Sequence, residues 1–333
     1  MTKLFGLILL MLTMLIPLMS CSEPSRAANG QADASSVFDR VYPATATVLR
    51  DGQIAGAGAF VSQSGHFLTA AHVVHNPTDR IELLLTDGRV VTAKTLASDL
   101  GHDMAILKIE LEGAPGFRPL ELAETLPPPG SRLYLVAAPS MLKETLLTGT
   151  SARNRLGFNF LGDRKCYTHT LLIAADAMPG SSGGCWMNEN GQIVGVQTAV
   201  LGDGKASHGL AMIAPASAAK RLLKQKRDQP TPTLGGEFVG LRTQGYGFNK
   251  RFPDGAAGVA LHNAFEGGPV AKAGIPKDHL ITHVDGVAVA DADAFLTQVR
   301  LRSPGDMLRL TVVSPDKHQT KEYDVKAAAL TWQ

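Results

Sequence analysis

Three short segments, widely separated along the chain, carry a histidine, an aspartate and a serine that could act together on a substrate. His72 ends an apolar segment, Asp103 directly precedes one, and Ser182 lies in the glycine-dense segment 180–184. A serine hydroxyl becomes a good nucleophile only when a base takes its proton, and that base needs an acid to fix its tautomer. We therefore predict a triad in which Ser182 is the nucleophile, His72 the base and Asp103 the orienting carboxylate.

Two neighbours of these residues offer other interpretations. Ser181 is an alternative nucleophile by adjacency alone, whereas the Ser-Gly-Gly pattern selects Ser182. His75 lies three residues beyond His72 and could suggest a metal site, but no third ligand lies nearby in the sequence. We therefore expect no metal and no cofactor.

Composition narrows the class of protein before any element is placed. The 333 residues are enough for about two domains. Thirty-two Lys and Arg against 30 Asp and Glu leave a formal charge of +2, which gives no support to a nucleic-acid-binding protein. Three cysteines cannot form a disulfide scaffold. Thirty-four glycines and 19 prolines in a chain with 6% aromatic residues favour many short strands joined by tight turns.

The elements that must position the three residues are therefore strands. Alternating patterns predict strands at 45–49, 58–61, 66–70, 80–85, 90–96 and 105–109. A second strand-rich block spans 132–214, after the breaker Leu126-Pro-Pro-Pro-Gly130. Two strand sets of similar size without long helices between them predict an all-β-dominated fold with two packed β-barrels.

A helix, a linker and a second domain follow the strand-rich blocks. Residues 216–227 have a helical pattern, and 228–233 carry two prolines and are expected to be a linker. Residues 234–333 have their own strands and a helix near 293–301, which is enough for a separate small domain. The first domain is accordingly predicted to span 37–227.

The N-terminus has the pattern of a targeting segment. Lys3 precedes an apolar run over 4–19 that is short for a membrane-spanning helix and typical of a secretory signal peptide. The run ends Leu18-Met-Ser-Cys21, which resembles the lipobox of bacterial lipoproteins and implies a signal peptide over 1–20 and lipidation at Cys21. Ser22 then implies sorting to an outer membrane. The alternative is an ordinary signal peptide cut near Ala27 or Ala28, and both place the mature protein outside the cytoplasm.

The stretch that follows Cys21 is rich in Ala, Ser and Gly, so residues 21–36 are expected to be a flexible tether. With lipidation at Cys21, we expect a lipoprotein of the cell envelope, on the periplasmic side of a membrane.

The three motifs together resemble the trypsin-like serine proteases, and more narrowly the HtrA/Deg family. The matching segments are 58–65, 103–108, 180–184, 191–196 and 209–215, and the resemblance covers 38–331. It implies a trypsin-like double β-barrel and an oxyanion hole formed by the backbone N–H groups of Gly180 and Ser182. The sequence departs from the family at two positions, with Ser181 where Asn is usual and Cys185 where Pro is usual.

The second domain resembles a PDZ domain. Phe238, Val239, Gly240 and Leu241 match the loop that receives a peptide C-terminus, and the peptide would then add to a strand by β-augmentation. The segments 268–275 and 281–286 match the core turns of such domains, and a groove helix would carry Phe295 and Val299. This resemblance implies hydrophobic peptide C-termini as partners.

Taken together, the resemblance implies an envelope-located, ATP-independent serine endopeptidase that cleaves misfolded or unfolded proteins under the regulation of a PDZ domain. It also implies a homotrimer, for which Phe38 and Tyr42 are candidate contacts. The alternative function is a gated peptide-binding sensor or chaperone in which the PDZ domain does the main work.

Two features stay open at the level of sequence. Asp176, six residues before Ser182, stands where basic-specific trypsin-like enzymes place their pocket carboxylate, whereas Leu210 and Met212 fit an apolar pocket for small aliphatic residues. Cys166 and Cys185 are either a disulfide or two buried free thiols.

Overall fold

The computed structural model describes residues 33–76, 78–110, 116–202, 207–241, 248–253, 255–315 and 319–332. The expected signal peptide, Cys21 and most of the expected tether lie outside these residues. Within them, no helix has both the length and the apolar character needed to span a membrane. Helix α1 (Ala34–Val41) begins inside the expected tether, so the extension of that tether to residue 36 was wrong. Val37 and Val41 are fully buried in the core, which explains why this segment is ordered as a helix.

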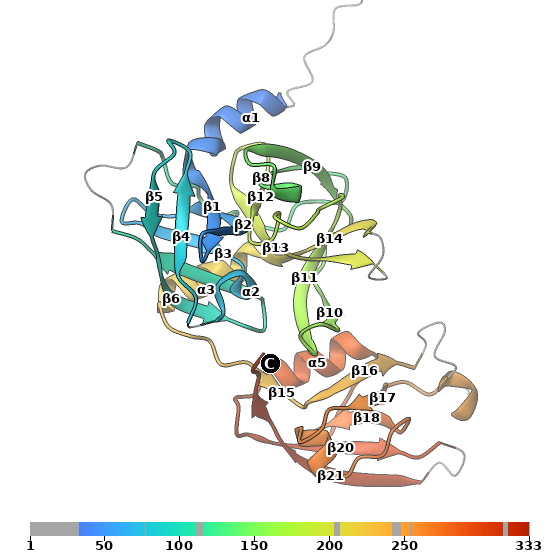
Figure 1. Ribbon diagram of the computed structural model, residues 1–333. Coiled ribbons are helices and arrows are strands. Elements are labelled where there is room, and N and C mark those ends of the chain that lie inside the picture. Colours follow the sequence, from blue (N-terminus) through green and yellow to red (C-terminus); the bar gives the residue numbers. More distant parts are fainter. Residues whose placement is uncertain are drawn as a thin grey trace, which may run out of the picture. The chain divides into compact units, whose positions relative to one another are not determined.

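The first group of strands forms one seven-stranded antiparallel sheet, drawn in blue and teal in Figure 1. Its strands are β1 (Thr45–Arg50), β2 (Gln53–Phe60), β3 (His66–Thr69), β4 (Ile81–Leu85), β5 (Val90–Thr92), β6 (Lys94–Asp99) and β7 (Met104–Lys108). They lie in the order β5-β4-β1-β2-β3-β7-β6. The prediction of one continuous strand over 90–96 was wrong. The chain turns at buried Ala93, whose N–H donates to the carbonyl of Ile81 (2.9 Å).

The second group closes on itself. Its strands are β8 (Arg132–Ala137), β9 (Thr145–Ser151), β10 (Gly157–Leu161), β11 (Cys166–Ala174), β12 (Cys185–Met187), β13 (Ile193–Gly202) and β14 (Ser207–Pro215). The order β10-β11-β14-β13-β12-β8-β9 is joined by a further pairing of β9 with β11, which leaves β10 outside the closed ring. The hairpin of β10 and β11 therefore extends from the barrel.

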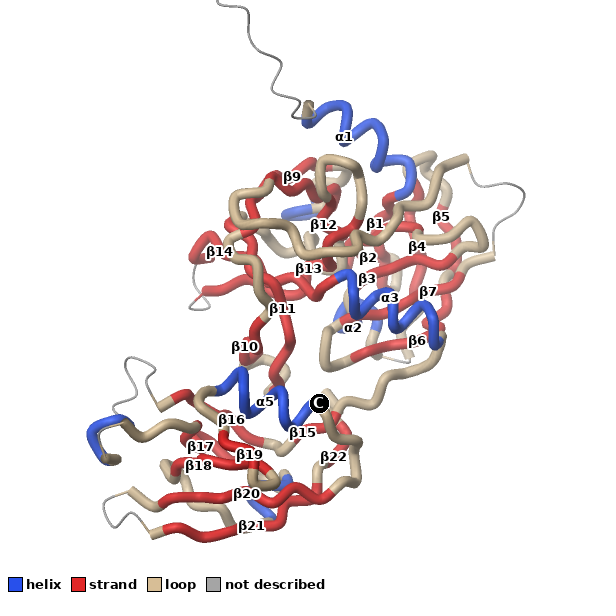
Figure 2. The backbone as a smooth tube through the Cα atoms, turned by 180° about the vertical axis from the view of Figure 1, so that it is seen from behind, coloured by secondary structure: helices blue, strands red, loops and turns tan. Residues whose placement is uncertain are grey.

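The two strand groups share a hydrophobic core. Phe60 and Phe67 of the first group and Tyr134 and Met187 of the second are all at most 1% exposed and belong to one packed cluster. Helix α3 (Ala216–Gln225) buries Leu222 in the same cluster and runs beside β6 and β7 (Figure 2). It ends two residues earlier than predicted, because Lys226 adopts a left-handed conformation that terminates it.

The expected linker is ordered rather than free. The carboxylate of Asp228 accepts hydrogen bonds from the backbone and the hydroxyl of Ser98 (2.8 and 2.9 Å). Strand β15 (Pro232–Thr233) then pairs antiparallel with β22 (Ala328–Ala329), a segment almost one hundred residues further along the chain. Residues 228–233 connect the barrels to the C-terminal sheet, and both ends of this segment are held by hydrogen bonds.

The C-terminal residues form a separate sheet with its own core. The strands β16 (Gly236–Gly240), β17 (Val259–Ala264), β18 (Leu280–Val284), β20 (Met307–Val313) and β21 (Thr320–Lys326) follow one another in that order, and β19 (Val287–Ala288) pairs with β18. Helix α5 (Ala292–Arg300) is capped by Asp291, whose carboxylate accepts from the N–H of Ala294. The described residues also form two short helices, α2 (Ala71–Val74) and α4 (Pro269–Lys272), and 3-10 turns at Tyr42–Ala44, Pro139–Met141 and Phe248–Arg251.

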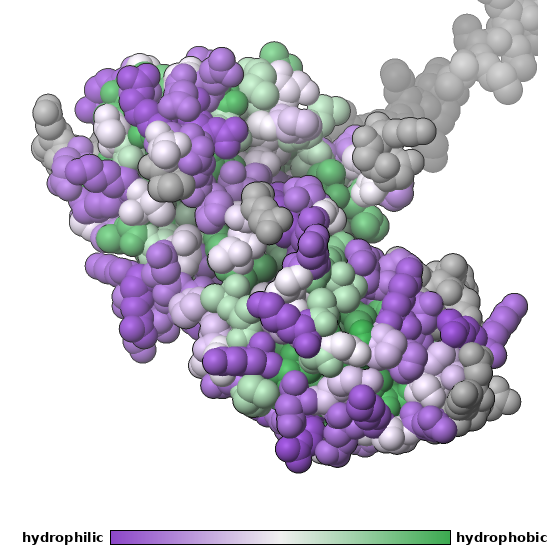
Figure 3. Space-filling model, turned by 60° about the horizontal axis from the view of Figure 1, so that its bottom comes forward, coloured by the Kyte–Doolittle hydropathy of each residue, from purple (hydrophilic) through white to green (hydrophobic). Residues whose placement is uncertain are grey.

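Strand β20 illustrates why these residues form a half-buried sheet. Leu308, Leu310 and Val312 alternate with more exposed residues and fill the core under α5, as expected for a strand with one buried face. The face drawn in Figure 3 is mostly hydrophilic, with hydrophobic side chains in small areas between charged ones.

Candidate active site

Two elements of the first sheet bring His72 and Asp103 together. His72 lies in the short helix α2 (Ala71–Val74), which follows β3, and Asp103 occupies the turn between β6 and β7. His72 Nδ1 lies 2.8 Å from Asp103 Oδ2, and the backbone N–H of His72 donates to Asp103 Oδ1 (2.9 Å). The two bonds hold the imidazole in one orientation, with Nε2 as the nitrogen left for a substrate or nucleophile.

The Asp103 carboxylate is completely buried and has two further donors. Thr198 Oγ1 and Arg164 Nη1 both donate to Oδ2, the latter at 2.7 Å. Burial by itself would raise the pKa of the Asp103 carboxyl. The charge and hydrogen bond of His72, the charge of Arg164 and the hydroxyl of Thr198 outweigh burial and hold that pKa below its ordinary value. Asp103 therefore stays ionised, as a residue that orients a histidine base must.

The serine loop has the backbone geometry that its glycines suggested. Gly180 has φ +94°, and a Cβ there would lie 2.0 Å from the carbonyl oxygen of Ala138, so only glycine fits. Among the described residues, no acceptor takes the N–H of Gly180 or of Ser182. An oxyanion hole needs backbone amides that have no other acceptor, and these two N–H groups meet that requirement.

The serine loop lies against the elements that carry His72. The N–H of Ala57 in β2 donates to the carbonyl of Ser182 (2.8 Å). A Cβ on Gly183 would meet Thr69 Oγ1 at 2.2 Å and Ala70 N at 2.8 Å, immediately before α2. The three predicted residues are thus brought to one place by β2, β3 and the turn before β7. Within the described part of the chain, the Ser182 hydroxyl makes no hydrogen bond to His72.

The two adjacent serines differ in their surroundings. Ser181 is 1% exposed, and its hydroxyl has no hydrogen-bond partner among the described residues. Ser182 is only half-buried. The more accessible hydroxyl is the one that a substrate can reach, which favours Ser182 over Ser181.

Thr198 and Arg164 were not among the sequence predictions. Thr198 lies two residues beyond the quoted segment 191–196, so its nearness to that motif was a usable signal. Arg164 lies in the turn between β10 and β11, 61 residues from Asp103, and nothing in its local sequence indicates the contact.

The expected substrate pocket is only partly supported. The Asp176 side chain is exposed and has no hydrogen bond or ion pair to other described residues, whereas its neighbours Ala175 and Ala177 are buried. Leu210 is half-buried at the start of the apolar part of β14. Met212 does not line an open pocket, because it is 4% exposed and packs in a cluster with Leu161, Cys166 and Leu330.

A short loop beside the serine loop exposes apolar side chains. Met141, Leu142 and Met178 are 51%, 67% and 49% exposed. The Ser140 hydroxyl lies 3.3 Å from the sulfur of Met178, and the Ser140 N–H donates to the carbonyl of Pro179. These apolar groups therefore border the predicted oxyanion loop.

Cys166 and Cys185 are free and buried, so the disulfide alternative is wrong and the free-thiol alternative is correct. Burial raises the pKa of the Cys185 thiol to about 12, which makes it chemically inert.

His75 faces the ring of Trp332, with ring centroids 5.1 Å apart. In the described ranges, no group of three or more His, Cys, Asp or Glu side chains is placed to hold a metal ion.

The segment matched to a peptide-binding loop lies on β16, an edge strand of the C-terminal sheet. The Tyr167 hydroxyl, from the hairpin of β10 and β11, contacts both the N–H and the carbonyl of Phe238 at 2.7 Å. Val239 and Leu241 are buried and Gly240 is half-buried. Phe295 and Val299 of α5 are buried too, and the space between Tyr167, Phe238 and α5 is a cavity of only about 20 Å³.

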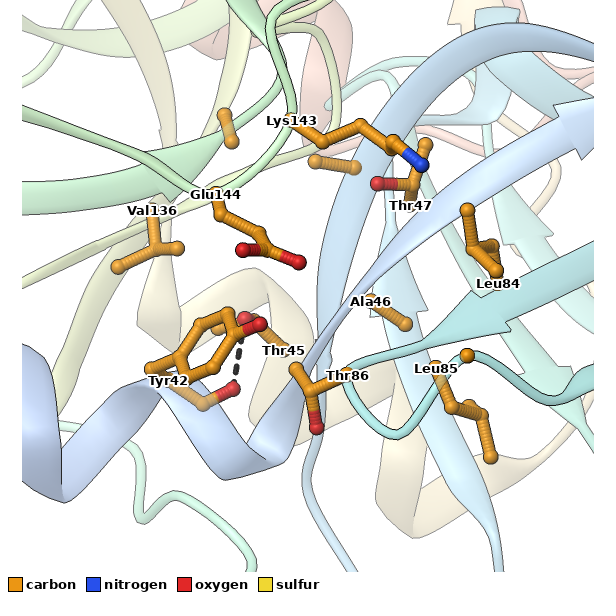
Figure 4. A pocket seen from close by; sticks show the side chains of 13 residues that line it. Tyr42, Thr45, Ala46, Thr47, Leu84, Leu85, Thr86, Val136, Lys143 and Glu144 are labelled. Atoms are coloured by element: carbon orange, nitrogen blue, oxygen red, sulfur yellow. Dashed lines mark hydrogen bonds between the residues drawn. The ribbon is translucent and has the colours of Figure 1, made fainter.

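Another small pocket, of about 100 Å³, lies among Tyr42, Thr47, Val136 and Glu144 (Figure 4). None of the predicted catalytic or substrate-pocket residues lines it. Burial and the nearby Glu144 carboxylate raise the pKa of Tyr42 to about 12. The Tyr42 ring also stacks on Phe38 with centroids 4.9 Å apart, so both aromatic side chains already have contacts within the chain.

Comparison with known proteins places this geometry in a family. Residues 56–196, which include His72, Asp103 and Ser182, match the trypsin-like peptidase domain. The serine endoprotease DegS of Escherichia coli K12 is 30% identical over 281 residues, which cover 81% of this chain and 76% of DegS. A probable periplasmic DegP-like serine endoprotease of Chlamydia trachomatis is 29% identical over 273 residues, which cover 79% of this chain and 52% of that protein.

Solved structures show the same fold. The HtrA-type protease AlgW with a tripeptide superimposes with a TM-score of 0.67 at 22% identity, covering 90% of this chain and 98% of AlgW. A serine endoprotease from Yersinia pestis gives a TM-score of 0.61 at 21% identity over the same fraction of each chain. The prediction of a trypsin-like double β-barrel is confirmed. With the DegS relationship, these matches show that the chain belongs to the HtrA family of serine endopeptidases.

Proposed function

We propose that Ser182, His72 and Asp103 are the catalytic triad of this endopeptidase, with the N–H groups of Gly180 and Ser182 as the oxyanion hole. The observation that carries the proposal is the pair of hydrogen bonds that join His72 to buried Asp103. This pair lies next to a serine loop in which the N–H groups of Gly180 and Ser182 have no described acceptor. The hydrogen-bonded His72 and Asp103 beside the serine loop, and the two amides without a described acceptor, favour an enzyme over a purely peptide-binding protein.

The geometry suggests the following course for peptide hydrolysis. Ser182 Oγ attacks the scissile carbonyl carbon while His72 Nε2 takes the hydroxyl proton, and the carbonyl oxygen becomes an oxyanion held by the two amides. His72 then gives the proton to the leaving amine, which releases the C-terminal product and leaves an acyl-enzyme. Water deprotonated by His72 hydrolyses the ester, and Asp103 stabilises the imidazolium in both halves.

The substrates we propose are unfolded or misfolded proteins. The exposed Met141, Leu142 and Met178 beside the serine loop would bind apolar side chains that folded proteins bury. Asp176 is exposed to solvent and pairs with no described residue, so a preference for small aliphatic residues before the cleaved bond is favoured over a preference for Arg or Lys.

We further propose that residues 37–227 are the protease domain and 234–333 a PDZ domain that takes hydrophobic peptide C-termini. A peptide that adds to the edge strand β16 would compete with Tyr167 for the backbone of Phe238. Peptide binding and the position of the β10–β11 hairpin are therefore expected to be linked.

The names of the relatives support an envelope location on the periplasmic side. We propose a lipid on Cys21 that anchors the chain to the outer membrane, with the residues between Cys21 and α1 as the tether. The proposed assembly is a homotrimer, in which Phe38 and Tyr42 would extend their stacked pair to a neighbouring copy.

Cleavage of unfolded casein by the full chain and two serine variants tests the assignment. Ser182→Ala should abolish both cleavage and labelling by a fluorophosphonate, whereas Ser181→Ala should retain both, because its hydroxyl bonds to no described residue. Adding a hydrophobic C-terminal peptide separates a gated enzyme, which gains activity, from a peptide sensor, which stays inactive. Proteolysis that persists in purified Ser182→Ala would refute the triad.

A further inference from the structure

Arg164 is a charged side chain at the triad that the usual roles of Ser, His and Asp do not require. It is 14% exposed, and its Nη1 lies 2.7 Å from Asp103 Oδ2, while Nη2 lies 3.4 Å from the carbonyl of Thr198. Nε faces Asp163 at 3.3 Å. Arg164 thus makes contact with the same carboxylate oxygen that holds the imidazole of His72.

The other face of the Arg164 guanidinium is covered by Trp332. The guanidinium carbon lies 5.5 Å from the centre of the Trp332 ring, within the range of a cation–π contact. The same ring packs against His75, three residues beyond His72. Trp332 therefore contacts a neighbour of each of two triad residues, although it lies far from both in sequence.

The position of Trp332 is fixed by the segment that precedes it. Strand β22 pairs with β15, and the N–H of Leu330 donates to the carbonyl of Thr231 (2.8 Å). Leu330 is 9% exposed and packs with Cys166 and Met212. We call residues 328–332 the return segment, because it comes back from the C-terminal sheet to the barrel side of the molecule.

A fully buried carboxylate needs a compensating charge, and removing one partner of such a pair is costly. His72 supplies a full positive charge only in the steps in which it is protonated. Arg164 supplies one throughout, and the Trp332 ring shields the guanidinium from water. Arg164 can thus keep Asp103 ionised and in place when His72 is neutral and ready to accept the proton of Ser182.

We propose that Arg164 is a positioning residue for the catalytic triad and that the return segment, through Trp332, holds it against Asp103. This inference rests on the triad proposed above. It makes the catalytic efficiency of the barrels depend on a segment that follows the C-terminal sheet.

The test compares kcat, KM and pH profiles on one peptide substrate for Arg164→Met, Arg164→Lys, Trp332→Ala and Trp332→Phe, with Ser182→Ala in the same series. Arg164→Met should lower kcat at least tenfold with little change in KM, because the polar contacts of Arg164 are with Asp103, Thr198 and Asp163 rather than with the serine loop. Arg164→Lys should restore part of kcat. Trp332→Ala should act in the same direction as Arg164→Met but less strongly, and Trp332→Phe should keep most of the activity.

The pH profile separates positioning from a merely structural role. Without the guanidinium, the whole charge of Asp103 acts on His72, so the acidic limb of kcat/KM should move up by about one pH unit. The variants leave in place the other titratable groups that contact Arg164 or Trp332 or act on them by charge, which among the described residues include Asp163, Cys166 and His75. A loss of stability alone would lower the melting temperature without moving that limb.

Each outcome has one interpretation. If Ser182→Ala is inactive but Arg164→Met and Trp332→Ala keep the wild-type kcat and pH midpoint, the further inference fails and the triad stands. If Trp332→Ala is more active than wild type, the return segment obstructs the site and the inference is overturned. If Ser182→Ala remains active, the proposed triad itself is wrong.

Discussion

Two aspartate–histidine pairs lie at one turn of this protein, and only one of them is in the proposed active site. In each pair the carboxylate Oδ2 lies 2.8 Å from a histidine Nδ1: Asp103 with His72, and Asp99 with His102. In each, the other carboxylate oxygen accepts the backbone N–H of the same histidine, at 2.9 and 3.1 Å. The hydrogen-bond geometry of the Asp99–His102 pair is thus nearly the same as that of the Asp103–His72 pair.

Their surroundings make the difference. His72 lies against the serine loop, whereas His102 faces Arg221, His169 and a neighbourhood that includes Arg300. Burial favours the neutral acid at Asp99, but His102 and Arg300 together hold its pKa below the ordinary value, as His72 and Arg164 do for Asp103. An aspartate–histidine pair with a lowered carboxyl pKa is therefore not by itself a sign of catalysis. The two pairs differ in that only His72 lies beside a serine and two backbone amides without acceptors.

The largest contrast should come from Asp103→Asn. An amide leaves the wrong tautomer on His72, and in a trypsin-like triad this change lowers kcat by about 10⁴. Asp103 has φ +53°, a conformation that Asn tolerates well, so the turn should be kept. Steady-state kinetics on a peptide substrate measure the effect. A loss of less than tenfold in kcat would mean that Asp103, like Asp99, is not needed for catalysis.

Gly180→Ala tests the backbone amides that lie near His72 and have no counterpart beside the Asp99–His102 pair. The new Cβ would lie 2.0 Å from the Ala138 carbonyl oxygen at φ +94°, so the loop has to move and the Gly180 N–H with it. Loss of one oxyanion donor lowers kcat by about 10²–10³. Single-turnover acylation rates measure this directly, with Ser181→Ala as the control in the same loop. An unchanged acylation rate would exclude the Gly180 amide from the oxyanion hole.

Asp99→Asn should affect stability rather than catalysis. The change weakens a buried charge-assisted contact with His102 and removes the charge near Arg300, so we expect a loss of about 1–3 kcal/mol in the free energy of unfolding. Urea unfolding followed by tryptophan fluorescence measures it, and kcat should stay within a few-fold of wild type. A fall in kcat as large as that of Asp103→Asn would show that the Asp99 pair takes part in the chemistry.

The smallest effect concerns pH. Burial, with the charges of His102 and Arg300, lowers the pKa of His169 to about 4, whereas an unfolded histidine titrates near 6.5. As the pH falls from about 6.5 to 4, the unfolded chain binds a proton that the folded chain does not, so stability decreases over that window. His169→Gln should flatten this part of a plot of urea midpoint against pH. An equally steep plot for the variant would assign the dependence to other groups.

The sequence predicted most strands of the first barrel and the strand-rich block that forms the second, and it proposed three catalytic residues, because those signals are local. Alternation marks strands such as β1 and β4, and each triad residue stands in a short recognisable segment. The contacts of Arg164 and Thr198 with Asp103 join residues 61 and 95 positions apart and have no local pattern. The order in the linker was missed for the same reason, since it comes from pairing between β15 and β22.

The prediction that Met212 lines the substrate pocket was wrong because of another contact between distant parts of the chain. Its apolar side chain fits a substrate pocket, but the same property lets Leu330 cover it from another part of the chain. Apolar character in a strand predicts burial, not the identity of the partner that buries it. The Asp176 alternatives could not be separated because an aspartate between two alanines can turn to either side, and here it turns to solvent.

The pairing of β15 with β22 has a consequence for how this protein can be rebuilt. The entry to the C-terminal sheet and the exit from it run antiparallel side by side, and neighbouring strands lie about 4.8 Å apart. The C-terminal module therefore begins and ends at the same place, on two paired strands. It could be exchanged for another module that closes on the same two strands, provided that the return segment is kept and the contact of Tyr167 with Phe238 is replaced.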